Sequence, residues 1–414
     1  MKASMIENKS TTKSKLAMLI LALTPILSMY GTMLNYAIWL FLLLIGYLVI
    51  SSNKKSLTYF PKYYNIYWVF LALDYFVLTR KLGAIIPGGL SFFVFSIILI
   101  FISRQFEFSF YRKYLRFILL VAIALFFAQE FMWYTTGSRF VPVLPLGNLT
   151  TTMTYSEMVA RNLAAERSAS IFLEPAHFAV YLLLGLMMEL GAYQGKRIFS
   201  GFAILIIITL LMLRSGTALA GLGVMLLYKF TFYLRKLSTG KKIFAAVLIS
   251  LITVGAISFY LRTEIGTEMS ERSQNELTLD EDGHSFVRFA AGAMIYSDLP
   301  IINKIVGASD DTLLPIARKY AGFFADDDAN ALYMNGWATA LTHTGIIGFL
   351  LLLLVLINLY KSGNELSRSG IWLFVALSFF SQTYTQPIML ITMIIATYYQ
   401  HQNKTIQLSS DVKQ

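Results

Sequence analysis

The sequence predicts an all-α protein that is embedded in a membrane by about twelve transmembrane helices. Two observations lead to this prediction. Hydrophobic residues make up 57% of the 414 residues and charged residues only 14%, whereas a soluble domain carries roughly 25% charged residues. Long apolar runs also recur along the whole chain, and about 20 apolar residues suffice for a helix to cross the hydrocarbon core of a bilayer. We therefore expect residues 1–414 to form a single polytopic membrane domain.

Twelve apolar runs are candidates for these helices. The first follows a lysine-bearing amino terminus that lacks a convincing small-residue cleavage site, so we expect an uncleaved first span. Several runs are short, and ten or eleven spans are also compatible with the pattern. The candidate runs centre near residues 16–30, 33–50, 64–79, 82–103, 115–134, 175–191, 197–213, 216–234, 243–261, 336–360, 370–382 and 384–399.

Positive charge is distributed unevenly between the predicted loops. The formal net charge of +11 can indicate nucleic-acid binding, but in a membrane protein it first reflects the enrichment of lysine and arginine in cytoplasmic loops. With twelve spans, the short loops on the other side hold only Arg80, Lys81 and Arg214. The asymmetry predicts that both termini are cytoplasmic, with Arg80 and Lys81 as its weakest point, and we expect no nucleic-acid partner.

Two segments are much longer than the other connections. They cover about residues 135–174 and 262–335, and both lie outside in the twelve-span topology. Long connections usually carry function. The chain has no cysteine, so thiolate chemistry is excluded. Two comparable halves, as in many transporters, are not evident because the long segments do not occupy corresponding places.

The first long segment ends in a polar motif, RSASIFLEPAHFAVYLL. Pro175 disfavours helix at Glu174 and suits a first helical turn, so the sixth span should begin there. Glu174, His177 and Tyr181 then follow one face of its outer end, where free N–H groups and the helix dipole attract anions. Arg161 and Arg167 precede this face. This polar face is either an anion-binding site at the membrane surface or an ordinary interfacial N-cap with a hydrogen-bonded histidine.

A second polar face opens the tenth span in ANALYMNGWATALTHTGIIGFLLLLL. Asn335, Thr339, Thr342 and His343 recur at helical spacing. His343 lies roughly 12 Å into the span at 1.5 Å per residue, and polar groups at such depth are functional candidates. A histidine that packs against a neighbouring helix is the alternative.

The second long segment also holds an arginine and two acidic runs. Arg288, in GHSFVRFAAGAMI, belongs either to a surface helix or to a site where its guanidinium binds a phosphate in bidentate fashion. The runs DEDGH and ADDDAN lack the alternating oxygen ligands of a calcium loop, so we expect no metal. No glycine-rich phosphate loop is present, and nucleotide donors are therefore not expected.

Two of these motifs resemble signatures of a known family. RSASIFLEPAHFAVYLL is similar to the R…S.F.EP[SA]H.A.Y signature of bacterial O-antigen and capsule polymerases, the Wzy-type proteins. NGWATALTHTGIIGFL is similar to the N…L…G..GF segment that follows their second large outer loop. The resemblance implies a GT-C-like, inverting membrane glycosyltransferase of lipopolysaccharide or capsule biosynthesis. It would act on undecaprenyl-diphosphate-linked glycans, in the bacterial cytoplasmic membrane, with the active site facing the periplasm or cell exterior.

The expected site combines the two motifs with nearby arginines. As catalytic residues we predict Glu174, His177, Arg167 and Arg288, and either Glu174 or His177 would act as the base that takes the acceptor proton. As substrate-binding residues we predict Arg161, Tyr181, Asn335 and His343. The expected partners are the lipid-linked oligosaccharide, membrane lipid and a chain-length regulator protein, and no cofactor is expected.

Three other functions remain open. The related O-antigen ligases perform the same chemistry with lipid A-core as acceptor, but they often carry a histidine where this chain has Met334. A lipid-linked oligosaccharide flippase or other transporter belongs to a different class and would favour short loops and midplane charges. A purely structural membrane scaffold would need no buried histidine.

Overall fold

The computed structural model is all-helical in the residues it describes, which confirms the predicted all-α class. The part of the chain it describes contains isolated bridges but no strand. The described residues are 12–31, 35–50, 58–75, 90–138, 140, 144, 146, 149, 160, 167–192, 199–235, 237–244, 255, 258, 260–263, 266–267, 291–320, 331–332, 334–384 and 386–411.

Helices occupy eleven of the twelve predicted apolar runs, and the run at 243–261 falls largely outside the described residues. Among the described helices, α6, α8, α10 and α17 are long and apolar enough to cross a membrane. The count of twelve spans and the GT-C-like fold stay predictions. The helices are α1 (Thr12–Leu27), α2 (Tyr36–Ile50), α3 (Tyr64–Leu73), α5 (Leu90–Ile102), α6 (Phe108–Thr136), α8 (Pro175–Ala192), α9 (Gly201–Met212), α10 (Gly216–Leu234), α13 (Gly292–Asp298), α14 (Ile301–Val306), α15 (Asp310–Ala317), α17 (Gly336–Ser362), α18 (Glu365–Phe380) and α19 (Pro387–Asp411).

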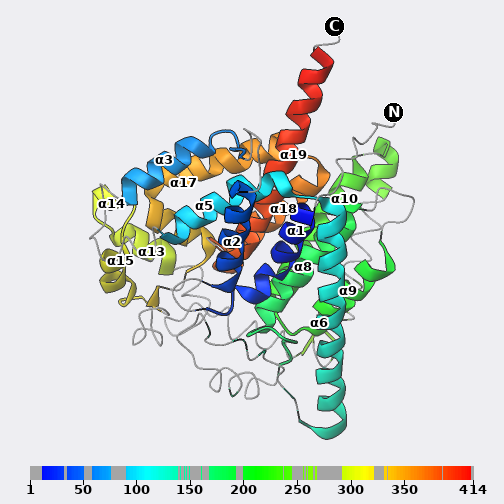
Figure 1. The fold of residues 1–414 in the computed structure, drawn as a ribbon. Coiled ribbons are helices and arrows are strands. Elements are labelled where there is room, and N and C mark those ends of the chain that lie inside the picture. The colour runs from blue at the N-terminus through cyan, green and yellow to red at the C-terminus, as the bar shows by residue number, and fades with distance from the viewer. Residues whose placement is uncertain are drawn as a thin grey trace.

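Helix α8 lies at the centre of the bundle (Figure 1). It packs against α6, α9, α10 and α18, and side chains on all its faces are buried. Gly185 lies directly against Leu119 of α6, and Gly221 of α10 lies directly against Leu183. Small residues at these crossings let the helices approach closely, as is common in membrane bundles.

One end of the bundle is rich in paired basic residues, and we call it the basic end. The buried carboxylate of Glu189, near the end of α8, accepts two hydrogen bonds from Arg112 at 3.0 and 2.9 Å and lies 3.3 Å from Arg116. Nearby, Lys229 of α10 pairs with Glu365 of α18 at 3.3 Å. Because the Glu189 carboxylate is paired with arginines of α6, its role is to hold α8 against α6 at this end of the bundle.

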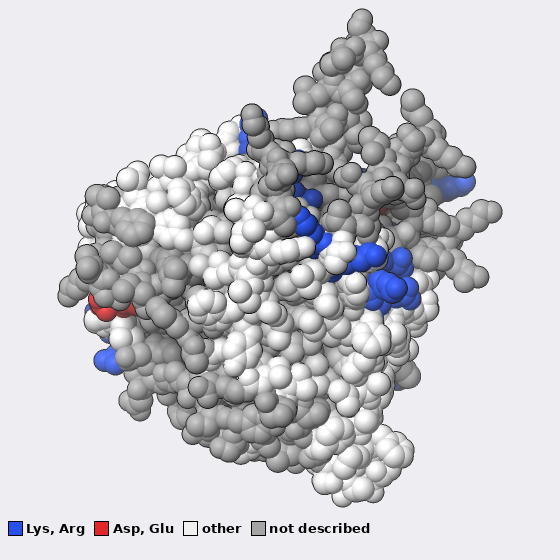
Figure 2. Space-filling model, viewed as in Figure 1, with Lys and Arg blue, Asp and Glu red and all other residues white. Residues whose placement is uncertain are grey.

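The helix ends that meet at the basic end are ones that the twelve-span topology assigns to the cytoplasmic side. Ser14 of α1 contacts Gln105 at 3.4 Å, and the main chain of Lys62 donates to Gln400 of α19 at 3.1 Å. In Figure 2 most basic side chains of the described surface lie toward the end from which α19 extends, and the projecting end of α6 carries none in this view. On this face of the described residues, positive charge is therefore concentrated toward one end of the bundle.

Helix α17 is broken within its length. Gly345 adopts φ 62° and ψ −177°, a conformation essentially confined to glycine. The short helices α13, α14 and α15 pack beside this break, on the flank of the bundle next to α17 (Figure 1). Helices α13 and α15 share a small core, which also includes Ala308 just after α14; it is formed by Ile295, Leu299, Ala308, Leu313, Ala317 and Met334.

Candidate functional site

Contacts between α6 and α8 place two carboxylates at one level of the bundle. The two helices are antiparallel and cross where Gly185 meets Leu119. Glu174 precedes Gly185 by eleven residues, and Glu130 follows Leu119 by eleven. At 1.5 Å per residue each lies roughly 16 Å beyond the crossing. Glu130 and Glu174 thus share a level at the end of the bundle opposite Glu189.

The beginning of α10 and the end of α18 reach the same level. Arg214 precedes Gly221 by seven residues, and Glu174 precedes Leu183, its contact, by nine. The hydroxyl of Thr217, in the first turn of α10, lies 3.4 Å from that of Ser381, which ends α18. Helices α8 and α10 therefore begin beside the end of α18.

The amino terminus of α17 completes this level. The main-chain N–H of Gly336 donates to the carbonyl of Ser381 at 2.9 Å, which places Asn335 beside the end of α18. We call this set the polar layer; it consists of Glu130, Arg167, Ser168, Glu174, His177, Arg214, Asn335 and Ser381. The structure thus brings the two sequence motifs together through α18, which packs against both α8 and α17.

The chain before α8 is held to α6 by side-chain hydrogen bonds. The Ser168 hydroxyl donates to the buried carboxylate of Glu130. Gln129 accepts from the Ser170 N–H at 2.8 Å, and the Ser170 hydroxyl donates to the Ala122 carbonyl at 2.6 Å. These bonds hold Ser170 at φ 55°, a rare value outside glycine. The segment that begins with Arg167 is therefore fixed against α6.

Glu130 is a residue of the layer that was not assigned to the site from the sequence. Its carboxylate is buried, with 3% of the residue exposed, in a part of α6, residues 117–134, that has no other charged residue. An ionisable residue in such a helix is a functional candidate by default. That rule could have selected it, but only the folded chain shows that Ser168 is its partner.

The predicted start of α8 at Pro175 is confirmed. The Glu174 carbonyl accepts the N–H groups of His177 at 3.1 Å and Phe178 at 3.3 Å. His177 is exposed and Glu174 is half-buried. A carboxylate and an imidazole are thus presented together at an accessible helix start.

Tyr181 is separated from these two residues. Its side chain is fully buried, and its hydroxyl donates to the Ala22 carbonyl of α1 at 2.6 Å. In the structure it packs α8 against α1, and its contact with substrate stays a prediction. The helical spacing predicts a shared face but not the depth to which that face is covered.

Arg214 is a second residue of the polar layer that was not assigned to the site from the sequence. The sequence placed it only among the three basic residues of the short outer loops. It is 7% exposed and has φ 52°, just before the first turn of α10. A buried guanidinium is costly unless polar or anionic groups surround it. The N–H groups at the start of α10 add to its positive potential. A strained, buried arginine at a helix start is a site where an anionic group would be stabilised.

Asn335 and His343 both have defined partners within the protein. The Asn335 side chain accepts the Ala338 N–H at 2.8 Å and so caps α17. His343 contacts the Thr339 carbonyl through Nδ1 at 2.9 Å and the Asp310 carboxylate of α15 through Nε2 at 3.0 Å. His343 therefore lies beside the break in α17, away from the polar layer.

Arg161 and Arg288 lie outside the described residues. In the described part of the chain, no group of three histidine, aspartate or glutamate side chains is placed to hold a metal ion.

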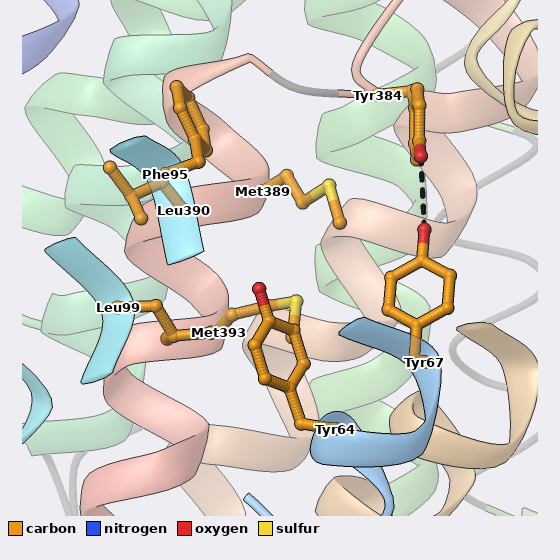
Figure 3. A pocket seen from close by; sticks show the side chains of 8 residues that line it. All are labelled: Tyr64, Tyr67, Phe95, Leu99, Tyr384, Met389, Leu390 and Met393. Atoms are coloured by element: carbon orange, nitrogen blue, oxygen red, sulfur yellow. Dashed lines mark hydrogen bonds between the residues drawn. The ribbon is translucent and has the colours of Figure 1, made fainter. Parts of the chain in front are cut away.

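A small cavity lies elsewhere, between α3, α5 and α19 (Figure 3). Its volume is about 20 Å³, enough for one water molecule. At one side of it, the hydroxyls of Tyr67 and Tyr384 form a hydrogen bond of 3.0 Å. The cavity is too small for a sugar, so the polar layer, in which His177 is exposed and Glu174 half-buried, is the better candidate for a substrate site.

Comparisons with known proteins do not assign a family. No protein-family model matches the sequence, and no curated protein matches it. The resemblance to polysaccharide polymerases therefore rests on the two motifs alone.

Proposed function

We propose that the protein is a polysaccharide repeat-unit polymerase of the bacterial cytoplasmic membrane. It would transfer the growing glycan from undecaprenyl diphosphate to the non-reducing end of the next lipid-linked repeat unit. The observation that carries the proposal is the polar layer, where the carboxylates of Glu130 and Glu174 lie level with the buried Arg214. The layer is at the end of the bundle opposite the basic end, as an outward-facing site requires.

The donor side of this reaction needs stabilisation of negative charge. The bond between the anomeric carbon and the diphosphate oxygen breaks, and undecaprenyl diphosphate leaves with the electron pair. The negative charge of the departing diphosphate would be stabilised by the positive potential of Arg214, the first turn of α10 and Arg167. Catalysis of this type depends on positioning and on electrostatic groups that are already in place, and the scheme needs neither nucleotide nor metal.

The acceptor side needs a base. An acceptor hydroxyl attacks the anomeric carbon from the opposite face, which inverts the configuration, and its proton passes to Glu174 or His177. Both groups sit at the accessible start of α8. Glu130, through Ser168, holds the chain that carries Arg167 and so acts as a positioning residue.

The test is lengthening of lipid-linked repeat units by purified protein in liposomes. With the cognate undecaprenyl-diphosphate-linked unit as the sole substrate, a ladder of longer products is expected without nucleotide, ion gradient or divalent metal. Glu174→Gln and His177→Ala should each slow the ladder. Products that form only after lipid A-core is added would indicate a ligase, and the absence of any lengthening would favour a transporter; either result overturns the proposal.

A further inference from the structure

Helix α14 exposes an apolar face. Three of its six residues are isoleucines that face outward: Ile301 is 77% exposed, Ile302 62% and Ile305 39%. The neighbouring Met294 of α13 is 41% exposed. Large apolar side chains grouped in this way mark a surface that meets another apolar phase.

Helix α14 packs against the break in α17. Its carboxyl end enters the break in α17: the Ala308 N–H donates to the Thr342 carbonyl at 2.9 Å, and the Ile305 main chain lies directly against Gly345. Gly307, at φ 105°, lies directly against the His343 carbonyl. Non-helical backbone within a membrane helix is tolerated where protein covers it, and α14 provides that cover.

The exposed face of α14 continues onto α17. Directly after Gly345, Ile346 and Ile347 are 39% and 40% exposed, and Leu350 and Ile357 farther along are 55% and 50% exposed. Helix α17 is one of the helices apolar enough to cross a membrane. Since lipid is the natural cover for the outward apolar positions of such a helix, the adjoining isoleucines of α14 lie on the same lipid-facing surface.

Charged residues border this surface as they do in interfacial helices. Lys304 lies within α14, and Asp298 and Lys319 form an exposed pair at 4.0 Å at the ends of α13 and α15. The inner side of α13 and α15 is closed by the small core, to which Ala308, just after α14, also belongs. An apolar outer face with charged edges is the pattern of an element that lies in the plane of the membrane interface.

We propose that α13, α14 and α15 form a membrane-interface element whose isoleucines, Ile301, Ile302 and Ile305, insert among the acyl chains of the bilayer. Part of the second long segment, residues 262–335, would then lie in the membrane surface and cover the break in α17. This proposal concerns lipid contact alone and does not depend on glycosyl transfer.

Site-directed spin labelling tests the proposal directly, because the chain has no cysteine. The variants are Ile301→Cys, Ile302→Cys and Ile305→Cys, each labelled and reconstituted in liposomes of phosphatidylethanolamine and phosphatidylglycerol. Ile357→Cys on α17 is the lipid-facing reference. Lys319→Cys is the matched exposed control on the same element, since the Lys319 side chain is 64% exposed.

The readout is the collision rate of each label with oxygen, which concentrates in the bilayer, relative to a water-soluble nickel chelate. The three α14 positions should resemble Ile357→Cys and exceed Lys319→Cys several-fold in this ratio. Frequent nickel collisions at all three positions would place the face in water and overturn the proposal. Low rates with both reagents would also overturn it, because they would mean that protein, such as a second copy, covers the face.

Discussion

Ser168 donates its hydroxyl hydrogen to the buried carboxylate of Glu130, and this bond joins the chain before α8 to α6. A similar bond occurs at the other end of the bundle, where the Ser200 hydroxyl donates to the buried carboxylate of Glu189 at 3.0 Å. The two serine–glutamate pairs provide a matched comparison between the proposed site and the basic end.

Ser168→Ala should slow glycan lengthening roughly tenfold, which corresponds to about 1.4 kcal/mol in the barrier. The substitution removes a donor from a buried carboxylate and releases the segment that begins with Arg167. Ser200→Ala is the control: it should lower the melting temperature without changing the rate per folded molecule. Equal effects of the two variants on the rate would contradict a site-specific role for Ser168.

The two ends of α8 provide a second comparison. Glu174→Gln removes a half-buried carboxylate from the proposed site and should lower the rate of lengthening with little change in melting temperature. Glu189→Gln breaks the pairing with Arg112 and should cost roughly 3 kcal/mol of stability, in the range for buried ion pairs that lose one partner. Thermal melts and initial rates on the same samples separate these outcomes, and a stable but inactive Glu189→Gln protein would argue against the assignment.

Arg214 and Arg235 flank the two ends of α10 and differ in burial. Arg214→Ala should abolish lengthening, and Arg214→Lys should restore it only in part, because lysine retains the charge but not the forked geometry that suits diphosphate. Arg235 is exposed at the opposite end, so Arg235→Ala should retain the wild-type rate. Binding of pyrophosphate, followed as competition with the donor, should weaken only in the Arg214 variants. Undiminished lengthening by Arg214→Ala would remove this residue from the site.

Gly345 permits the break in α17, and an alanine there is strained in two ways. Its φ of 62° and ψ of −177° suit glycine alone, and a Cβ would overlap the main chain of Ile305. Gly345→Ala should therefore destabilise the protein by about 2 kcal/mol or more. Gly223→Ala, in open space on α10, should be neutral or stabilising by up to about 1 kcal/mol. Chemical denaturation in detergent measures both, and a neutral Gly345→Ala would show that α14 does not require the break.

His343 and Asp310 should be energetically coupled. Their contact at 3.0 Å joins α17 to α15, while the Asp310 side chain is 61% exposed, so the coupling should be modest, about 0.5–1 kcal/mol. A double-mutant cycle with His343→Gln and Asp310→Asn measures it. Additive effects on stability would show that the pair contributes nothing to holding α15.

The placement of helices follows closely from the sequence because apolar runs of sufficient length have few alternatives in a membrane. The start of α8 at Pro175 was predictable from the backbone chemistry of proline alone. The break at Gly345 was not, since a glycine in an apolar run is equally compatible with a close helix crossing. Only the presence of Ile305 and Gly307 beside it explains the conformation.

The candidate site could be predicted in part. Glu174 and His177 were found because they interrupt an apolar pattern at a helix start. Glu130 and Arg214 were not assigned, since their role depends on which helices are neighbours and at what depth they cross. Tyr181 illustrates the converse: its spacing matches the motif, but its burial is decided by α1, which is far away in the sequence.

The central position of α8 has a consequence for how the protein responds to different bilayers. A helix enclosed by other helices does not sense hydrocarbon thickness, so its 18 residues need not match the membrane. The 29-residue α6, with Phe117 and Leu120 facing outward, can tilt or adjust when acyl chains lengthen or shorten. Mismatch is thus absorbed at the periphery, and the residues at the start of α8 keep their arrangement as the composition of the host membrane changes.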